Sequence, residues 1–562
     1  MKLFRKQIDV IGFGLLLAVL LFAALKMSAL NVREVAAGNG GGMPSTHLFL
    51  PAIFGDAAPD AEPQPTGAGV TVVILDRGID WRHPDFLNPD GSTRIKWILD
   101  MTGQTNWCAP GQPEPVEYSE ADINAALQDG MTLPHRDAVG HGTATVGMAA
   151  GNGSALPGAP YAGVAPEADL VIVKLTSEGA PAHGSVPAEA PINGCLDDAL
   201  DWVDEKIDAL GQPAVALWNA GTQWGPIDGT SAASRKIAEV FGAHRPGRVW
   251  VASSGDEGSL PSHAGGQYTS GEATEVPFDN LTTGDSYLTA WYSGDAPANV
   301  SIRLPGGAVV GPVGPGQSIT ASGVTIIQYM PGNEFYPWTS TSGDRAVWIR
   351  ISGNQGEGAF LIEGTSATQG RFDLYGDLRG AAPLTPSIEF LDLLVPGRLN
   401  DVSATEGAIV VGVHVARDSY LDIDGIERDF SHEGEAGDLW LKSSGGPTRD
   451  GRDVMAVTAE GQNAFASLAQ DSHWSTLRAN LPMSGEGYYV RFGGTSAAGP
   501  IVVGTVALML EVNPDLTGYV VQHILQQTAT SDPFTGPVPN GDWGYGKLNI
   551  EAAVQAAEQP IE

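Results

Sequence analysis

Three short motifs in this sequence carry side chains that together can hydrolyse an amide bond. Asp76 ends the apolar run GVTVVILD, His141 follows a glycine in DAVGHGTATVG, and Ser496 follows two glycines in FGGTSAAGP. A serine attacks a carbonyl carbon when a histidine takes its proton and a carboxylate orients that histidine. Small neighbours at Gly140 and Gly142 would let a substrate backbone approach the histidine. Each motif alone is more often a turn, a structural histidine or a helix cap, so the hydrolytic interpretation depends on all three.

Elements of an α/β fold must position these side chains. Short continuous apolar runs are typical of strands buried on both faces, and helical stretches lie between them. Strands alternating with helices predict a mostly parallel, doubly wound sheet. In such a sheet, sites form at the carboxyl ends of the strands, where Asp76 lies. We expect strands at 69–76, 168–175, 214–221, 248–255 and 406–416, and helices after His141 and at 196–210, 231–244 and 496–514.

Together, the motifs resemble those of the subtilisin-like serine proteases, peptidase family S8. The order Asp76, His141, Ser496 is the family's order. The resemblance covers residues 67–266 and 396–558, and the flanking residues extend it: HPDF follows the first motif, and GYGKLNIEAAV resembles the family's closing segment. It implies a serine endopeptidase that acts through an acyl-enzyme. Ser496 would be the nucleophile, His141 the base and Asp76 the residue that orients it, with no cofactor required for the chemistry.

An insertion separates the two parts of this predicted catalytic domain. Residues 267–395 contain short alternating segments separated by turns, a pattern that predicts an antiparallel β-sandwich or jelly roll. Trp291, Trp338 and Trp348 would either fill its core or form a binding platform for a carbohydrate or a protein. In the second case the insert would be a binding module, which is an alternative function for the protein.

The expected substrate-binding strand departs from the family pattern. The family commonly has Asn-x-Ser-x-Gly here, whereas this chain has Asn219, Ala220 and Gly221. Gly221 still permits a peptide to pair along the strand edge. Trp218 and Trp224 would shape pocket walls or, for Trp218 in particular, fill the core.

A second departure places an acid at the expected oxyanion site. The family has an asparagine that donates to the oxyanion at the position where this chain has Asp256, in VWVASSGDEGS. An ionised Asp only accepts hydrogen bonds, whereas a protonated one donates. A kexin-like branch of the family carries Asp here and remains a protease. We therefore expect Asp256 to act as a neutral donor and to shift the useful pH downward. A catalytically weak or inactive pseudoprotease with a binding role is the alternative.

Composition and the N-terminus limit the remaining possibilities. A net charge of −35 argues against nucleic acid and anionic lipid as partners. Residues 1–37, with an apolar run at 10–25, predict a signal peptide or a signal anchor, and 38–66 a Gly/Pro-rich linker. The protein would then be secreted or anchored to the membrane, outside the cytoplasm. Cys108 and Cys195 would form one disulfide there or remain two thiols.

The resemblance implies a peptide or protein substrate. The resemblance also allows structural calcium, but no Asp/Asn cluster in the sequence has a spacing that indicates where calcium would bind. The sequence does not indicate the oligomeric state.

Overall fold

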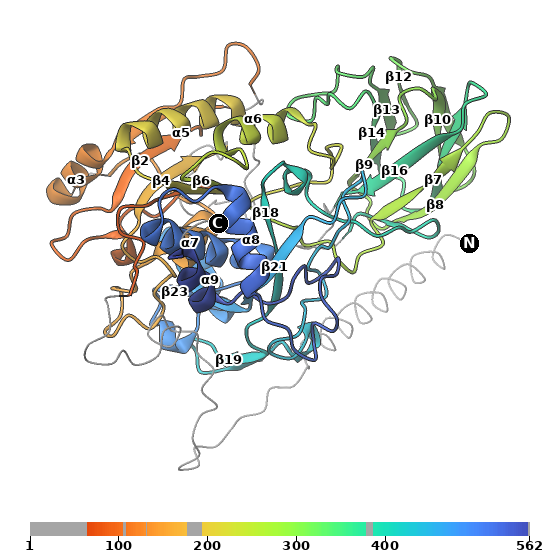
Figure 1. The fold of residues 1–562 in the computed structure, drawn as a ribbon. Helices are drawn as coiled ribbons and strands as arrows, with labels where there is room; N and C mark the ends of the chain where they lie inside the picture. Colours follow the sequence, from red (N-terminus) through yellow and green to blue (C-terminus); the bar gives the residue numbers. More distant parts are fainter. Residues whose placement is uncertain (1–63, 105–107, 131, 177–193, 378–385, 560–562) are drawn as a thin grey trace, which may run out of the picture.

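The structure of the protein is a computed structural model that describes residues 64–104, 108–130, 132–176, 194–377 and 386–559 (Figure 1). The predicted signal or anchor segment and nearly all of the predicted linker lie outside these residues. Two parts are visible in Figure 1: a sheet layered between helices, and a smaller pair of sheets beside it.

The larger part is built on an eight-stranded sheet with the order β21-β18-β6-β5-β1-β4-β2-β3. Neighbouring strands are parallel, except that β3 runs antiparallel to β2. The predicted mostly parallel α/β sheet is therefore confirmed. Its strands are β1 (Thr71–Asp76), β2 (Ile95–Asp100), β3 (Val116–Ser119), β4 (Asp169–Lys174), β5 (Ala214–Trp218), β6 (Arg248–Ser253), β18 (Ile409–Val415) and β21 (Met455–Gln462).

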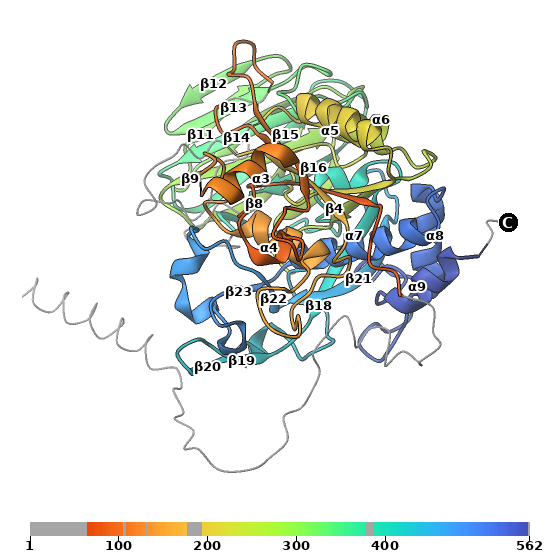
Figure 2. The ribbon, with the colours of Figure 1, turned by 90° about the vertical axis from the view of Figure 1, so that its left-hand side faces the viewer.

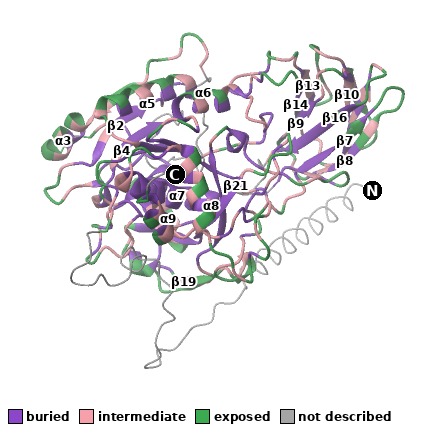
Figure 3. Ribbon diagram, viewed as in Figure 1, coloured by how far each residue is buried: buried purple, intermediate pink, exposed green. Residues whose placement is uncertain are grey.

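Helices cover both faces of this sheet, which is why its strands are apolar throughout. Alternate residues of β1 show this: Val72 and Ile74 pack in one core cluster with α4, α7 and α9, while Val73 and Leu75 pack in another with α5 and α6. Figure 3 shows the buried strands between the two helical layers. The helices are α3 (Glu120–Asp129), α4 (His141–Ala150), α5 (Leu196–Leu210), α6 (Ala232–Phe241), α7 (Thr495–Val512), α8 (Gly518–Thr528) and α9 (Ile550–Ala557).

Helix α7 is the most apolar of these elements and lies in the core of the larger part. Among the described residues, it is the helix that is long and apolar enough to cross a membrane, and 83% of that stretch is buried inside the protein. It ends at Val512, two residues before Pro514, as the sequence predicts.

The smaller part consists of two antiparallel sheets that enclose their own apolar core (Figures 1 and 2). The strand orders are β11-β10-β15-β8-β17 and β12-β13-β14-β9-β16-β7. This arrangement is the predicted β-sandwich. Its strands are β7 (His263–Tyr268), β8 (Thr274–Asn280), β9 (Asp285–Tyr292), β10 (Ala298–Arg303), β11 (Val309–Val313), β12 (Ser318–Ala321), β13 (Val324–Gln328), β14 (Arg345–Ser352), β15 (Gly356–Gly364), β16 (Gly370–Gly376) and β17 (Ile388–Phe390).

The three tryptophans of the insert do not form an exposed platform. Trp291 and Trp338 are buried, at 0% and 2% exposure, and Trp348 is half-buried against Tyr287. The indole N–H of Trp291 donates to the backbone oxygen of Trp224, at 3.0 Å, in the larger part. Trp338 packs with the cluster under α5 and α6, not in the sandwich core. Two of these side chains therefore hold the insert against the larger part.

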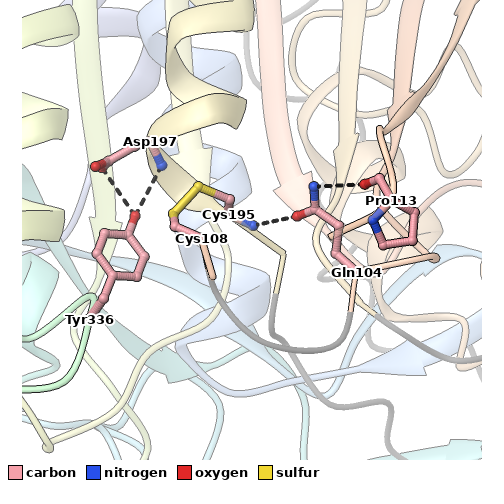
Figure 4. Close-up of a disulfide and its surroundings, with 6 residues drawn as sticks. All are labelled: Gln104, Cys108, Pro113, Cys195, Asp197 and Tyr336. Atoms are coloured by element: carbon pink, nitrogen blue, oxygen red, sulfur yellow. Dashed lines mark hydrogen bonds between the residues drawn. A yellow bond between two sulfur atoms is a disulfide. The ribbon is translucent and has the colours of Figure 1, made fainter. Parts of the chain in front are cut away.

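A disulfide and a tyrosine fix the beginning of α5 (Figure 4). Cys108 and Cys195 are joined by a disulfide, and Cys195 directly precedes α5. Tyr336 reaches across from the insert: its hydroxyl accepts a hydrogen bond from the Asp197 N–H and donates one to the Asp197 carboxylate, both at 3.0 Å. The same helix end is thus held by a covalent bond and by the insert.

Two short antiparallel pairs complete the larger part. Their strands are β19 (Ser419–Leu421) with β20 (Glu427–Asp429), and β22 (Ala464–Ser467) with β23 (Tyr489–Phe492).

Candidate active site

Asp76 and His141 form a hydrogen-bonded pair. Asp76 is the last residue of β1 and is 2% exposed, and His141 is the first residue of α4. Both carboxylate oxygens of Asp76 lie 2.9 Å from Nδ1 of His141. Asp76 also accepts hydrogen bonds from the Arg77 N–H and from the Thr145 hydroxyl. With its oxygens held in this way, Asp76 fixes the orientation of the imidazole and leaves Nε2 to face outward.

The start of α4 is held by an acid that the sequence analysis did not single out. Asp137 accepts hydrogen bonds from the Gly140 N–H and from the N–H and hydroxyl of Thr143. Gly142 has a packing role that the sequence analysis did not predict. A Cβ at this position would lie 2.1 Å from the Gly78 carbonyl oxygen, so the glycine allows α4 to pack against the end of the first motif.

Thr145 is a second functional neighbour that the sequence analysis missed. It lies four residues after His141, so both side chains project from the same face of α4. Its hydroxyl binds Asp76 at 2.9 Å. The i, i+4 spacing from the histidine was the signal that would have found it.

Ser496 comes to the same site from a distant part of the sequence. Strand β23 leads into Gly493 and Gly494, and Ser496 is the second residue of α7. Gly494 has a φ of 73°, a conformation that favours glycine. Because the first N–H groups of a helix lack partners within the helix, the Ser496 N–H is available beside its own hydroxyl. The site therefore offers a hydroxyl and a backbone donor next to each other.

A cleft of about 720 Å³ brings these groups together. His141, Asp256 and Ser496 all line it, together with aromatic side chains. The imidazole of His141 meets Trp474 and Phe492 edge to face, with ring centroids 5.8 and 5.3 Å away. These two rings pack against the imidazole and restrict its movement.

Asp256 lies beside the first turn of α7. Its Oδ1 accepts hydrogen bonds from the N–H and the hydroxyl of Thr495, each at 2.9 Å. A Cβ on Gly494 would lie 2.6 Å from Oδ2, so this second oxygen sits against the glycine turn. Burial raises the pKa of Asp256 above its ordinary value, although the Thr495 bonds oppose this shift. The raised pKa favours the protonated form, which can donate from Oδ2.

The neighbouring Glu257 is a second buried acid that the sequence analysis did not single out. Burial, reinforced by the charge of Asp256, raises the pKa of Glu257 to about 8. Its Oε2 accepts a hydrogen bond from the Ser444 hydroxyl at 3.0 Å. Asp256 lines the cleft, and the adjacent Glu257 is buried beside it.

The residues predicted to bind substrate differ in their exposure. The Asn219 side chain is buried and is already engaged: its Nδ2 donates to Thr145 and to the Ser496 carbonyl oxygen, each at 2.8 Å. Ala220 is half-buried and Gly221 is exposed, so the backbone beyond β5 is open at its edge. Trp218 is a core residue at 2% exposure, and Trp224 contacts aromatic rings of the insert.

The described part of the chain contains no group of three or more His, Cys, Asp or Glu residues that could hold a metal ion.

Comparisons with known proteins agree with this geometry. The model of the subtilase family matches residues 67–546. Serine protease AprX of Bacillus subtilis is 33% identical over 112 residues, covering 20% of this chain and 24% of that protein. Neuroendocrine convertase 2 of Drosophila melanogaster is 30% identical over 159 residues, covering 26% and 24%. The matched segments thus span about a quarter of these relatives' own length.

One solved structure supports the fold over most of the chain. The Clostridium perfringens CspB protease superposes with a TM-score of 0.66 at 22% identity, covering 88% of this chain and 94% of the other. The family match extends from before β1 to the closing segment after α8, and it includes all three motifs that meet in the cleft. The chain therefore belongs to the subtilase family, peptidase family S8.

Proposed function

We propose that the protein is a serine endopeptidase that hydrolyses peptide bonds through Ser496, His141 and Asp76. The observation that carries this proposal is the pair of 2.9 Å contacts from Asp76 to His141 Nδ1, in a cleft that Ser496 also lines. Family membership gives independent support.

The proposed reaction has two stages. The Ser496 hydroxyl attacks the scissile carbonyl carbon while His141 Nε2 takes its proton. His141 then gives this proton to the leaving amine, and an acyl-enzyme remains. Water, deprotonated by the same histidine, hydrolyses the ester. Asp76 stays ionised and stabilises the imidazolium that forms at each stage.

Two donors would stabilise the oxyanion. One is the Ser496 N–H at the positive end of α7. The other is protonated Asp256 Oδ2, which takes the place of the family's asparagine amide. The raised pKa of Asp256 supports this role. Since His141 acts as a base only when neutral and Asp256 donates only when protonated, activity would be confined to a limited pH range.

Labelling with a fluorophosphonate probe tests the proposal. The full chain should react at Ser496 and cleave casein, whereas Ser496→Ala should lose both properties and His141→Ala should lose most of each rate. Ser259→Ala is the matched control, because Ser259 lines the same cleft without a proposed role. It should be labelled like the wild type. An unlabelled, folded wild-type protein would instead indicate the pseudoprotease.

We also propose that the protein acts outside the cytoplasm. The disulfide supports this, because such bonds persist in oxidising compartments. One relative, from Xanthomonas campestris, is named an extracellular protease. Cell fractionation with N-terminal sequencing distinguishes the two predicted forms. A secreted protein would begin near Gly38, and an anchored one would retain residues 1–37 in the membrane fraction.

A further inference from the structure

Two glycine-containing segments flank Ser496 and define a slot beside it. The segment Asn219–Gly221 leaves β5, and its Asn219 amide donates to the Ser496 carbonyl oxygen at 2.8 Å. The segment 254–256 leaves β6, and its Gly255 N–H donates to Thr495 Oγ1 at 3.2 Å. A substrate carbonyl placed at Ser496 Oγ, with its oxygen toward Asp256, puts the residue that carries this carbonyl, which is the residue before the cleaved bond, beside both segments. The space between them must therefore receive that residue's side chain.

The side chain of Asn400 occupies this space. A Cβ on Gly221 would lie 2.2 Å from both Cγ and Nδ2 of Asn400, and a Cβ on Gly255 would lie 3.3 Å from its Oδ1. One side chain thus contacts both glycines. Asn400 is 6% exposed. The slot is consequently closed a short distance below the substrate backbone.

Asn400 is held firmly in this position. Its backbone N–H donates to the Ser254 oxygen at 2.9 Å, and its Nδ2 donates to the Ser253 oxygen at 3.2 Å. The next residue, Asp401, is fully buried and accepts hydrogen bonds from the Ile227 N–H and the Ser231 hydroxyl. The loop therefore cannot retreat without breaking buried hydrogen bonds, which is costly.

We propose that Asn400 determines specificity by restricting the residue before the cleaved bond to glycine, alanine or serine. A larger side chain would meet Asn400 within the slot and would have to displace it from Ser253. This inference rests on the proposed peptidase function and names the substrate class of that site. The polar floor also explains why serine should be accepted, since the amide of Asn400 can pair with a hydroxyl.

A panel of peptides that differ only at this residue tests the inference. The panel contains Gly, Ala, Ser, Leu or Phe there, and cleavage sites are mapped by mass spectrometry. The wild type should favour Ala over Phe by about 100-fold in kcat/KM, a ratio within the range that pocket size can impose. In Asn400→Gly this ratio should fall at least about tenfold, through a gain on Leu and Phe.

Asn400→Ala provides a second variant with a smaller backbone effect, and Asn280→Ala is the matched control. Asn280 is also fully buried and hydrogen-bonded, but it lies in the insert, so its loss should leave the ratio unchanged. Wild-type cleavage after Phe or Leu as fast as after Ala would overturn the inference. So would an unchanged ratio in a folded Asn400 variant. If Ser496 is labelled but cleavage ignores the varied residue, the selectivity alone fails. If both labelling and cleavage are absent, the peptidase function fails as well.

Discussion

Replacing Asp256 with asparagine should convert a pH-limited enzyme into one that remains active at higher pH. Two hydrogen bonds from Thr495 hold Oδ1 as an acceptor. In Asp256→Asn the amide oxygen can keep these bonds, so Nδ2 takes the position of Oδ2 against the Gly494 turn. The variant therefore presents a donor at every pH, whereas the wild type does so only when Asp256 is protonated.

The size of the effect on kcat/KM follows from the protonation state of Asp256. Below its raised pKa, Asp256 is neutral and the two enzymes should have similar kcat/KM. Above it, the neutral fraction falls tenfold per pH unit, so the ratio of variant to wild type rises tenfold per unit. The ratio should level off at about 10² to 10³, the effect of one oxyanion donor, or about 2.7–4 kcal/mol.

The assay is kcat/KM for a peptide with alanine before the cleaved bond, measured from pH 5 to pH 9 for both enzymes. Asp256→Ala is the control: it removes the donor at every pH and should be slower than Asp256→Asn throughout. A ratio of variant to wild type that does not change with pH would refute the reasoning, as would an asparagine variant that is no faster at neutral pH.

Three further predictions concern stability. Replacing Cys108 and Cys195 with serine removes the disulfide and should lower the free energy of unfolding by about 4.6 kcal/mol, because the bond closes a loop of 87 residues. An unchanged urea midpoint would contradict this. The pKa of Glu257 in the folded protein is raised to about 8, so the wild type should lose stability as pH rises from about 4.5 to 8. In Glu257→Gln the melting temperature should depend less on pH over this range. Gly142→Ala should destabilise the protein by at least about 2 kcal/mol and lower kcat, because the new methyl group meets the Gly78 oxygen.

Matched substitutions separate these effects from general damage. Glu435→Gln removes a carboxylate from the surface and should leave the pH dependence of melting unchanged. Gly284→Ala adds a methyl group whose nearest neighbour is at 3.4 Å, an ordinary contact, and should cost little. If either control behaves like its partner, the explanation based on burial or on close contact is wrong.

Local patterns in the sequence were sufficient to predict the strands and helices that position the candidate site. Asp76, His141 and Ser496 each stand inside a motif with its own strand end or helix start, and the apolar runs predicted the sheet that joins them. The helix at 196–210 has the predicted bounds, because its apolar spacing and the glycine at its end are local signals.

Features that depend on distant packing could not be predicted in the same way. Asn400 contacts Gly221 across 179 positions of sequence, and no pattern near either residue indicates this contact. Trp338 belongs to the insert by sequence but packs with α5 and α6. The packing role of Gly142 could not be predicted for the same reason, since its neighbour Gly78 is distant in the chain. Chain topology, which single motifs do not contain, decides these contacts.

The position of the insert has a consequence for the order of folding. Strands β6 and β18 pair in the central sheet, although 156 positions separate Ser253 from Ile409. The ends of the insert meet, since Ala264 and Leu394 form an isolated bridge. If Ala264 and Leu394 come together first, only about 26 residues remain in the loop that must close before β6 pairs with β18. This shorter loop lowers the entropic cost of closure by about 1.6 kcal/mol. The β-sandwich should therefore form early, and the part of the chain that contains Ser496 should dock last.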